Sequence, residues 1–393
     1  MWNKIVEDCV SCFGNSRKYG WSKWKYTNNN SKLGLYVNIP FCEKKCFYCN
    51  FFSIKYDPIL VDDYINALVK HARHFRGRKI GSIYFGGGTP SVLSLNQIQK
   101  LLQLLNNIFD LTSLYEFTFE LNPESVSKEK LHLLKSLGVN RLSIGLQSTE
   151  SESLKFLGRA HSFEKFCDIY NSARKEGFDN INIDLIYGLP NQIVEGWVGI
   201  LEKVLLFDSE HLAIYPLSIE KDSLFYKNDV VIDDEIQRNM YDETVEILSS
   251  NNYFHYEISN WSKKNKESFH NIHYWRNLEY IGLGSGAAGY LNRIRYKNIT
   301  DVKRYIRLVN GNSQRIKIER TYISEKLYGM ESIILGLRLL NYGVDISYFS
   351  SPRLSGILLE CLKNKMLLCQ AGKVKLALDY VFVSSQILLK FME

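Results

Sequence analysis

The sequence lacks any apolar run that approaches the ~18 residues needed to cross a lipid bilayer. It also lacks the apolar core of a secretory signal, because residues 1–32 end in a polar threonine, asparagine and serine run. Glu7 and Asp8 argue against an organelle transit peptide, which avoids early acidic residues. We interpret residues 1–32 as an N-terminal extension. We expect a cytoplasmic protein, with an organelle matrix as the alternative location and peripheral membrane contact left open.

Concentrated positive charge is also missing. The formal net charge is +7, but the basic residues are scattered and the densest clusters, at 73–79 and 293–297, are short. A dedicated nucleic-acid binder usually carries a more focused basic stripe. These charges are better explained as solvated surface. We therefore expect no nucleic-acid partner, and an RNA-modifying activity is kept only as an alternative.

The cysteines do not form the pattern of a disulfide-stapled protein. There are eight in 393 residues, and three of them lie within the segment 42–49. Such crowding favours metal binding in a reducing compartment. Cys9 and Cys12 form a CxxC pair, but no second pair or nearby histidine completes a zinc site with them. We interpret that pair as incidental.

Alternating β-rich and helical segments fill the first half of the chain. The expected strands are 33–39, 80–85, 115–121, 141–146, 180–187 and 212–219. The expected helices between them are 58–75, 96–109, 128–137, 163–176 and 194–207. This alternation predicts right-handed βαβ units and a parallel sheet. Six units are too few for a closed eightfold barrel, so we predict an α/β fold with a partial (β/α)6 TIM-like barrel. A doubly wound sheet is the competing arrangement.

The rhythm changes after this core, which we place at 33–222. Residues 223–320 are expected to connect it to the rest, with a helix at 233–250 and a glycine-rich turn at 282–289. Residues 321–393 are expected to form a small, mainly helical accessory domain, for which a winged-helix arrangement is one option. Its expected helices are 324–340 and 354–368, followed by a hairpin of 373–378 with 380–384.

Directly after the first strand comes the spacing CxxxCxxC, formed by Cys42, Cys46 and Cys49. Three thiolates at these spacings can each bind one iron of a cuboidal [4Fe–4S] cluster. The fourth iron then has no protein ligand and can chelate the amino and carboxylate groups of a small molecule. A structural zinc site needs four protein ligands, and no further Cys or His stands at a suitable distance. Tyr48, before the last cysteine, is a candidate to shield the cluster or to contact an adenine ring.

Polar residues follow several of the predicted strands. They are the turn Gly86-Gly87-Gly88-Thr89-Pro90, then Glu120, Gln147 with Arg159 beyond it, and Asp184. Glycines in such a turn let a backbone approach a ligand closely. Each residue alone has a plainer explanation, such as a tight turn, a helix cap or a surface charge. Together they lie at the strand ends where barrels of this kind place their sites.

The cysteine spacing, with an aromatic residue before the last cysteine, resembles the signature of the radical S-adenosylmethionine (SAM) superfamily. Members reductively cleave SAM to a 5′-deoxyadenosyl radical with an electron from the cluster, which a flavodoxin- or ferredoxin-like donor would supply. The resemblance is to the coproporphyrinogen dehydrogenase-like branch and spans about residues 33–340. The positions matching its SAM contacts are Tyr36, Gly87, Gly88, Thr89, Glu120, Gln147, Arg159, Asp184 and Ile186. It implies that Gln147 and Arg159 meet the SAM carboxylate and Asp184 the ribose hydroxyls.

Two features favour one sub-family of this branch. The porphyrinogen-decarboxylating members carry a fourth cysteine two positions after the third, where this chain has Phe51. The run from His270 to Trp275 resembles the HNxxYW motif of the heme chaperone sub-family (HemW), which implies heme binding and delivery to heme-dependent respiratory proteins. His270 is then the candidate heme ligand, and His273 a second. Coproporphyrinogen III oxidation, or another porphyrin-directed reaction, is the alternative.

Overall fold

The computed structural model describes residues 32–221, 223–311 and 316–392. The expected extension 1–32 lies outside the described residues, apart from Lys32. Within the described part of the chain, no helix has both the length and the apolar character that crossing a bilayer requires.

Parallel strands form the centre of one twelve-stranded sheet. In their order across the sheet they are β11 (Tyr280–Leu283), β1 (Leu33–Ile39), β4 (Ile80–Gly87), β5 (Glu116–Leu121), β6 (Arg141–Gln147), β7 (Ile181–Tyr187) and β8 (His211–Pro216). Antiparallel strands extend the two edges: β12 (Ala288–Leu291), β13 (Ile294–Asn298) and β14 (Lys317–Tyr322) beyond β11, and β10 (Asn260–Ser262) and β9 (Phe254–Glu257) beyond β8. Residues 223–320 therefore contribute strands to both edges of the sheet.

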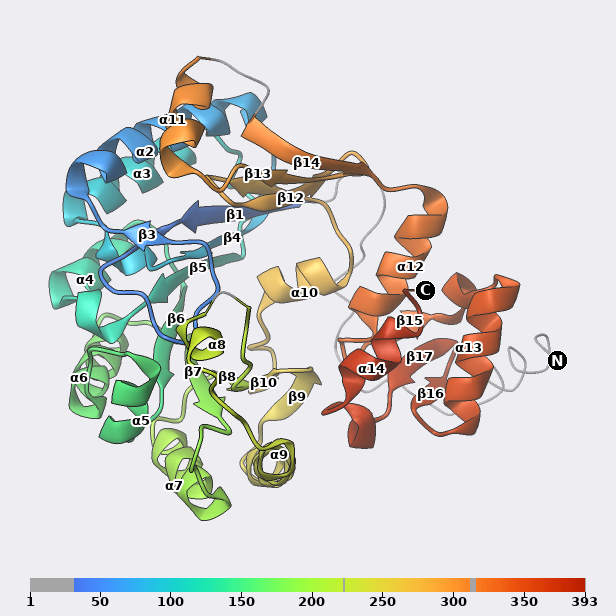
Figure 1. Cartoon of the computed structure of the whole chain (residues 1–393). Helices are drawn as coiled ribbons and strands as arrows, with labels where there is room; N and C mark the ends of the chain where they lie inside the picture. The colour runs from blue at the N-terminus through green and yellow to red at the C-terminus, as the bar shows by residue number, and fades with distance from the viewer. Residues whose placement is uncertain (1–31, 222, 312–315, 393) are drawn as a thin grey trace.

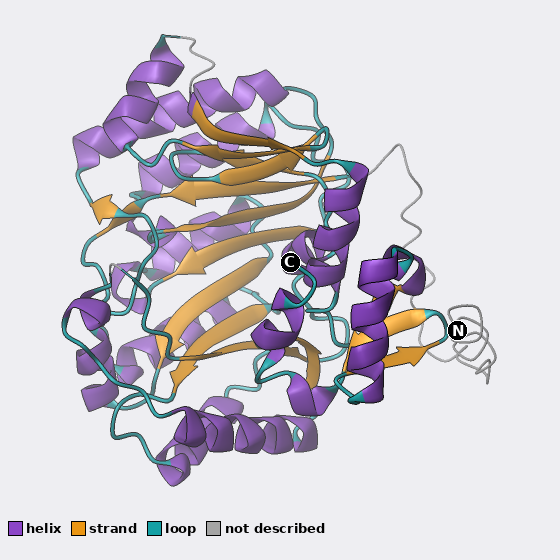
Figure 2. Ribbon diagram, turned by 45° about the vertical axis from the view of Figure 1, so that its right-hand side comes forward, coloured by secondary structure: helices purple, strands orange, loops and turns teal. Residues whose placement is uncertain are grey.

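Helices cover the outer side of this curved sheet (Figures 1 and 2). They are α2 (Pro58–Ala72), α3 (Leu95–Asn106), α4 (Lys128–Ser136), α5 (Ser151–Leu157), α6 (Phe163–Lys175), α7 (Val194–Leu205), α9 (Asp234–Ser250) and α11 (Val302–Asn310). In α3 the buried residues Ile98, Leu101, Leu102 and Leu105 form one face, and a capping box of Ser94 with Gln97 starts the helix. The predicted partial β/α barrel is confirmed, with β11 as a parallel strand that the sequence did not predict.

The parallel strands have one apolar and one polar face. In β5, Phe117 and Phe119 face the helices, whereas Glu116, Thr118 and Glu120 alternate with them. The same alternation places the following polar side chains on the inner face: Tyr36, Ser82, Tyr84, Arg141, Ser143, Asn182, Asp184, His211 and Tyr215. Parallel strands buried on both faces usually read as continuous apolar runs. The interior of this barrel is instead a polar lumen.

The C-terminal part contains α12 (Glu325–Gly336), α13 (Pro352–Lys363) and α14 (Ser384–Leu389), with a sheet in the order β15 (Val344–Asp345), β17 (Lys373–Leu376) and β16 (Leu367–Gln370). With the short 3-10 helix Ile346–Phe349 between β15 and α13, the element order from α12 to β17 is that of a winged helix. These elements lie beside α10 (Phe269–Trp275) and β9 in Figure 1. The lumen thus has the C-terminal part near one end.

One local prediction was wrong and another was incomplete. The hairpin pairs β16 with β17, not 373–378 with 380–384, because Ala371 and Gly372 both have positive φ (51° and 71°) and turn the chain in two residues. The expected glycine-rich turn is present at 284–287, but residues 282–283 end β11 and residues 288–289 begin β12. Gly282 is needed in β11 because a Cβ would lie 1.8 Å from the Ala288 carbonyl oxygen. The two-residue turn decided the position of the hairpin, whereas β11 became a strand by pairing with β1, which is distant in the sequence.

Candidate functional site

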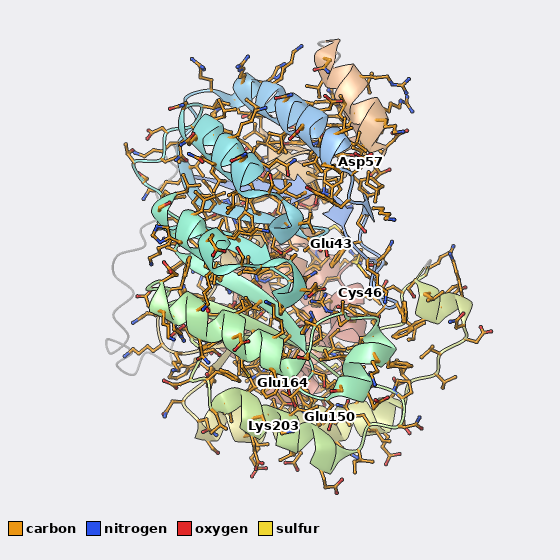
Figure 3. The ribbon with its side chains drawn as sticks, turned by 90° about the vertical axis from the view of Figure 1, so that its left-hand side faces the viewer. Glu43, Cys46, Asp57, Glu150, Glu164 and Lys203 are labelled. Carbon is orange, nitrogen blue, oxygen red and sulfur yellow. The ribbon has the colours of Figure 1, made fainter. Side chains whose placement is uncertain are left out.

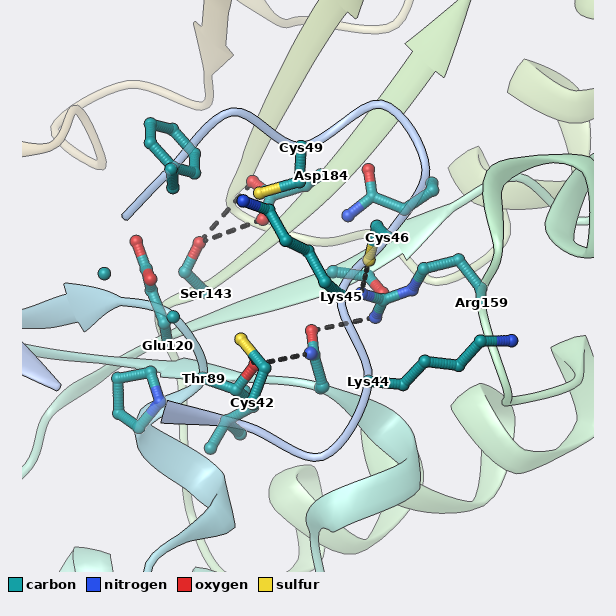
Figure 4. A pocket seen from close by; sticks show the side chains of 18 of the residues that line it. Cys42, Lys44, Lys45, Cys46, Cys49, Thr89, Glu120, Ser143, Arg159 and Asp184 are labelled. Carbon is teal, nitrogen blue, oxygen red and sulfur yellow. Dashed lines mark hydrogen bonds between the residues drawn. The ribbon is translucent and has the colours of Figure 1, made fainter. Parts of the chain in front are cut away.

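The cysteine loop leaves β1 and runs across the end of the barrel at which the strands finish. The short parallel pair β2 (Phe41–Cys42) and β3 (Ile54–Lys55) closes the loop at its base. Cys42, Cys46 and Cys49 are all partly exposed and line one pocket (Figure 4). Figure 3 looks onto this end of the molecule, with Cys46 on the near side and Glu164 on the neighbouring helix α6.

The three thiols surround the pocket without meeting at one point. Among the described residues, no three His, Cys, Asp or Glu side chains lie close enough to share a single metal ion. A cluster in which each of three irons binds one thiolate requires thiolates that are spread around it in this way. Hydrogen-bond donors reach two of the sulfurs: Thr89 Oγ1 is 3.4 Å from Cys42 Sγ, and Arg159 Nη1 is 3.4 Å from Cys46 Sγ. The donor set therefore fits a [4Fe–4S] cluster.

Without a metal, burial favours the protonated form of Cys42 and Cys49. It raises the pKa of Cys42, and it raises the pKa of Cys49 to about 11. Iron binds the deprotonated thiolate. The positive charge of a bound metal lowers the pKa of the thiol and so reverses the preference for the protonated form.

The pocket collects most of the site residues expected from the sequence. It spans about 700 Å³ when the space open to solvent is counted. Besides the cysteines it is lined by Tyr48, Gly87, Gly88, Thr89, Glu120, Gln147, Arg159 and Asp184. Tyr36 and Ile186 lie just behind this lining. Tyr36 stacks on Tyr84 at 6.2 Å, and Ile186 packs in a small apolar cluster against Phe47 and Tyr48 of the cysteine loop.

The glycine turn after β4 brings the backbone against the cysteine loop. At Gly87, φ is 113° and a Cβ would lie 1.9 Å from Asn38 Oδ1, so no other residue fits. At Gly88, a Cβ would lie 2.8 Å from the Phe41 carbonyl oxygen and 3.0 Å from Cys42 Sγ. Thr89 N donates to the Phe41 carbonyl oxygen at 2.9 Å. The turn and the first cysteine therefore hold each other in place.

Arg159 is a buried cation held by residues from several strand ends. Its Nη2 donates to Asn122 Oδ1 (2.8 Å) and to the Gly145 carbonyl oxygen (3.0 Å), and lies 3.5 Å from Glu124 Oε2. His161 Nδ1 contacts the same Glu124 oxygen at 3.1 Å. Arg159 Nε is buried without a partner. The planar guanidinium is thus fixed against the pocket, an arrangement suited to a carboxylate.

Gln147 has an unusual backbone conformation. Its φ is 70°, and the pairing of β6 with β7 shifts register between Gly145 and Gln147. Such a bulge re-aims a side chain at a functional edge of a sheet. A non-glycine residue with positive φ is strained, and such residues cluster at functional sites, where the surrounding structure holds them in place.

Two carboxylates face the pocket in poorly hydrated surroundings. Burial raises the pKa of Glu120 to about 8, although Tyr84 donates to its Oε1 at 2.8 Å. Burial likewise raises the pKa of Asp184 to about 6, against the stabilising contact from Asn182 Nδ2 at 2.6 Å. Arg141, which is 2% exposed, lowers both pKa values through its charge. Both carboxylates are therefore available to take up a hydrogen-bonding or cationic ligand.

Glu120 predicts a pH dependence of stability. Its folded pKa of about 8 lies above the ordinary 4.5, so the folded state binds the extra proton between these values. The contribution of Glu120 to the free energy of unfolding of the cofactor-free protein should then fall as pH rises from about 5 to 8. We expect a loss on the order of 2 kcal/mol, since solvent in the pocket moderates the effect. Urea titrations should show that the free energy of unfolding of the native protein falls relative to that of Glu120→Gln over this pH range; a constant difference between the two proteins would contradict the assignment.

His270 lies inside the barrel and not on the pocket wall. It is 1% exposed, with Nδ1 2.8 Å from Ser82 Oγ and Nε2 2.7 Å from Tyr274 Oη. Burial holds its pKa well below the ordinary value, so the imidazole is neutral. Glu116 of β5 accepts hydrogen bonds from the backbone N–H groups of Phe269 (2.8 Å) and His270 (3.0 Å), fixing the start of α10. His273 is also buried, with Nε2 2.6 Å from the Glu279 carbonyl oxygen.

Several residues of this site were not predicted as such. His161, Tyr84, Arg141 and Asn182 hold the pocket side chains in place. A signal for three of them is present in the sequence: polar residues alternate with apolar ones along β4, β6 and β7. His161 carries no such signal.

Comparisons with known proteins show which sequences and which solved structure this chain is similar to. Residues 36–204 match the sequence profile of the Radical SAM superfamily. The chain is 37% identical over 335 residues to the heme chaperone HemW of Lactococcus lactis, which covers 84% of each protein. It is 34% identical over 366 residues to HemW of Bacillus subtilis, covering 89% of this chain and 95% of the relative. The solved structure of the coproporphyrinogen III oxidase HemN from Escherichia coli, a radical SAM enzyme, is similar in fold, with a TM-score of 0.81 over 92% of this chain and 90% of that one at 23% identity.

Proposed function

The chain belongs to the HemW family of radical SAM proteins, and we propose that it binds heme and delivers it to heme-dependent respiratory proteins. Membership of the radical SAM superfamily implies a [4Fe–4S] cluster and SAM. The name of the relatives supports heme as the cargo.

We assign the cluster to Cys42, Cys46 and Cys49, whose thiols line the pocket. A bound cluster of this family supplies an electron to SAM, and a flavodoxin- or ferredoxin-like protein is the proposed donor. Hydrogen bonds to the sulfurs from Thr89 and Arg159 would stabilise the added negative charge and raise the reduction potential.

The remaining pocket residues are proposed to hold SAM. Arg159 and Gln147 would bind its carboxylate, and Asp184 its ribose hydroxyls. The turn at Gly87, Gly88 and Thr89 would receive its amino group. Glu120, Tyr36 and Ile186 complete the proposed set, with Ile186 and Tyr36 acting from behind the lining. The convergence of these side chains from successive strand ends supports the assignment.

One observation favours the chaperone over a porphyrinogen-decarboxylating enzyme. Phe51 lines the pocket and is 67% exposed, at the position where the decarboxylating members resembled here carry a fourth cysteine. The test is to load the purified protein with heme and mix it with heme-depleted respiratory membranes under anaerobic conditions. Heme should pass to the membranes without chemical change. Retention of heme by the protein, or decarboxylation of coproporphyrinogen III by it, would overturn the proposal.

His270 is our proposed axial ligand, and its surroundings set the test. Its Nε2 is engaged by Tyr274, so ligation of heme iron there requires the tyrosine hydroxyl to give way. Tyr274→Phe should free this nitrogen and tighten heme binding, whereas His270→Ala should weaken it by about tenfold or more, corresponding to at least 1.4 kcal/mol. Both variants should keep the cluster. A Soret titration unchanged in both variants would assign His270 a purely structural role.

A further inference from the structure

Three segments far apart in the sequence meet beside the lumen. Glu257 ends β9, Trp275 ends α10, and Arg338 follows α12 in the C-terminal part. Leu340 N donates to the Tyr256 carbonyl oxygen at 2.9 Å, which fastens the segment after α12 to β9. The Arg338 guanidinium lies 4.3 Å from the centroid of the Trp275 ring. The stacking gives the cation a fixed plane, because guanidinium groups bind flat on aromatic faces.

The charge of Arg338 is not neutralised by a partner. Its Nε is buried without a hydrogen-bond acceptor, and it forms no ion pair with a carboxylate in the described ranges. Burial lowers the pKa of Arg338, which is the sign of a desolvated cation. Leaving such a group without an anion costs free energy that a bound anion recovers.

Glu257 is the nearby carboxylate, but its oxygen accepts hydrogen bonds from other residues. It accepts hydrogen bonds from Asn260 Nδ2 and from Ser259 N, the latter at 3.3 Å. Burial raises its pKa, which weakens the negative charge that it could offer. The Trp275 indole nitrogen is close enough to affect this pKa without meeting hydrogen-bond geometry. Glu257 lies close enough to raise the pKa of Arg338 against the effect of burial, but it forms no ion pair with the guanidinium, which can therefore still accept a carboxylate from outside.

Tyr215 lies near both Arg338 and the carboxylates of the pocket. It lies on the inner face at the end of β8. It is near enough to Arg338 to raise the pKa of that guanidinium against the effect of burial. Besides desolvation inside the barrel, the charges of Asp184, Glu257 and Glu120 in turn raise the pKa of Tyr215. Tyr215 is 41% exposed, and its position in β8 places it on the inner face of the sheet, so its exposed part faces the interior of the barrel. The Arg338–Trp275 pair thus lies beside the same inner face of the barrel that carries Asp184 and Glu120.

We propose that the Arg338 guanidinium, held flat on Trp275, binds a propionate carboxylate of heme at this end of the lumen. The inference rests on the proposed heme-binding function and names the group that anchors the cargo. Planar, paired N–H donors match the two oxygens of a carboxylate. The aromatic faces of Trp275 and Tyr215 provide apolar surface for the porphyrin ring beside it.

The test compares heme with heme dimethyl ester, in which both carboxylates are blocked. Equilibrium titrations followed by the Soret band should show that the native protein binds heme about 10- to 100-fold more tightly than the ester, as expected for a charge-assisted contact. In Arg338→Leu this preference should disappear, mainly because heme binds more weakly. Arg338→Lys, which keeps the charge and loses the paired donors, should retain part of the preference.

Arg238→Leu is the matched control. It removes one positive charge, as Arg338→Leu does, but from an exposed position on α9 where Arg238 pairs with Asp242. It should keep the full preference for heme. If the native protein binds heme and its ester equally, or if Arg338→Leu keeps the preference, the carboxylate site is wrong while heme binding stands. If the native protein binds neither ligand, the proposed function itself fails. The ester comparison on the native protein does not depend on any variant folding.

Discussion

Substituting Cys46 with serine should abolish [4Fe–4S] binding. The three cysteines line one pocket and each is assigned one iron, so loss of one thiolate leaves two irons without a protein ligand. Serine keeps the size of the side chain but is a poor iron ligand at neutral pH. After anaerobic reconstitution, iron and sulfide in the variant should fall to the background of unliganded protein.

Cys167→Ser provides the control for this experiment. Cys167 lies on α6, outside the pocket lining, and its replacement should leave iron and sulfide unchanged. Full cluster content in Cys46→Ser, or an equal loss in both variants, would contradict the ligand assignment. Arg159 also loses the sulfur contact at 3.4 Å, so SAM binding should weaken along with cluster loss.

Replacing Gly88 with alanine should have nearly as large an effect, although it adds one methyl group. The new Cβ would lie 2.8 Å from the Phe41 carbonyl oxygen, 2.9 Å from Phe41 N and 3.0 Å from Cys42 Sγ. Two of these atoms are backbone and the third belongs to a proposed cluster ligand, so none can yield at low cost. We expect a loss of about 1–3 kcal/mol in stability, typical of overpacking. Cluster content after reconstitution should fall as well, because Cys42 is displaced.

Gly199→Ala is the matched substitution at a position with room. Gly199 lies inside α7, and a Cβ there would meet no atom within 4 Å. Alanine in a helix interior should raise stability by roughly 0.5–1 kcal/mol. Opposite signs for the two variants in urea unfolding, with cluster loss only in Gly88→Ala, are the expected result. Equal stability and equal iron content would show that the turn does not support the cysteine loop.

Local sequence patterns were enough to predict which of their residues lie together. The spacing of Cys42, Cys46 and Cys49 lies within one loop, so their common pocket follows from chain connectivity. Glu120 and Asp184 could be placed at the same edge because the carboxyl ends of parallel strands meet there. The strand ends converge on this edge, with Gly87 and Gly88 beside the loop.

Contacts between distant segments were not predictable in the same way. His161 supports Arg159 only through Glu124, which comes from the end of another strand. The hairpin of β16 and β17 was misplaced because its turn, Ala371-Gly372, lacks the asparagine or aspartate that usually signals such turns. β11 was missed because its short run with Gly282 becomes a strand only by pairing with β1.

By itself the sequence determined the β/α barrel, the cysteine loop and the strand ends that carry polar groups, because each depends on periodicity or spacing within a few residues. Only the tertiary structure decided that His270 is enclosed between Ser82 and Tyr274, and that Arg338 lies on Trp275 facing the lumen. Those positions depend on how segments far apart in the chain pack together. Burial and charge at such contacts arise from the sum of many weak interactions, which no local pattern in the sequence encodes.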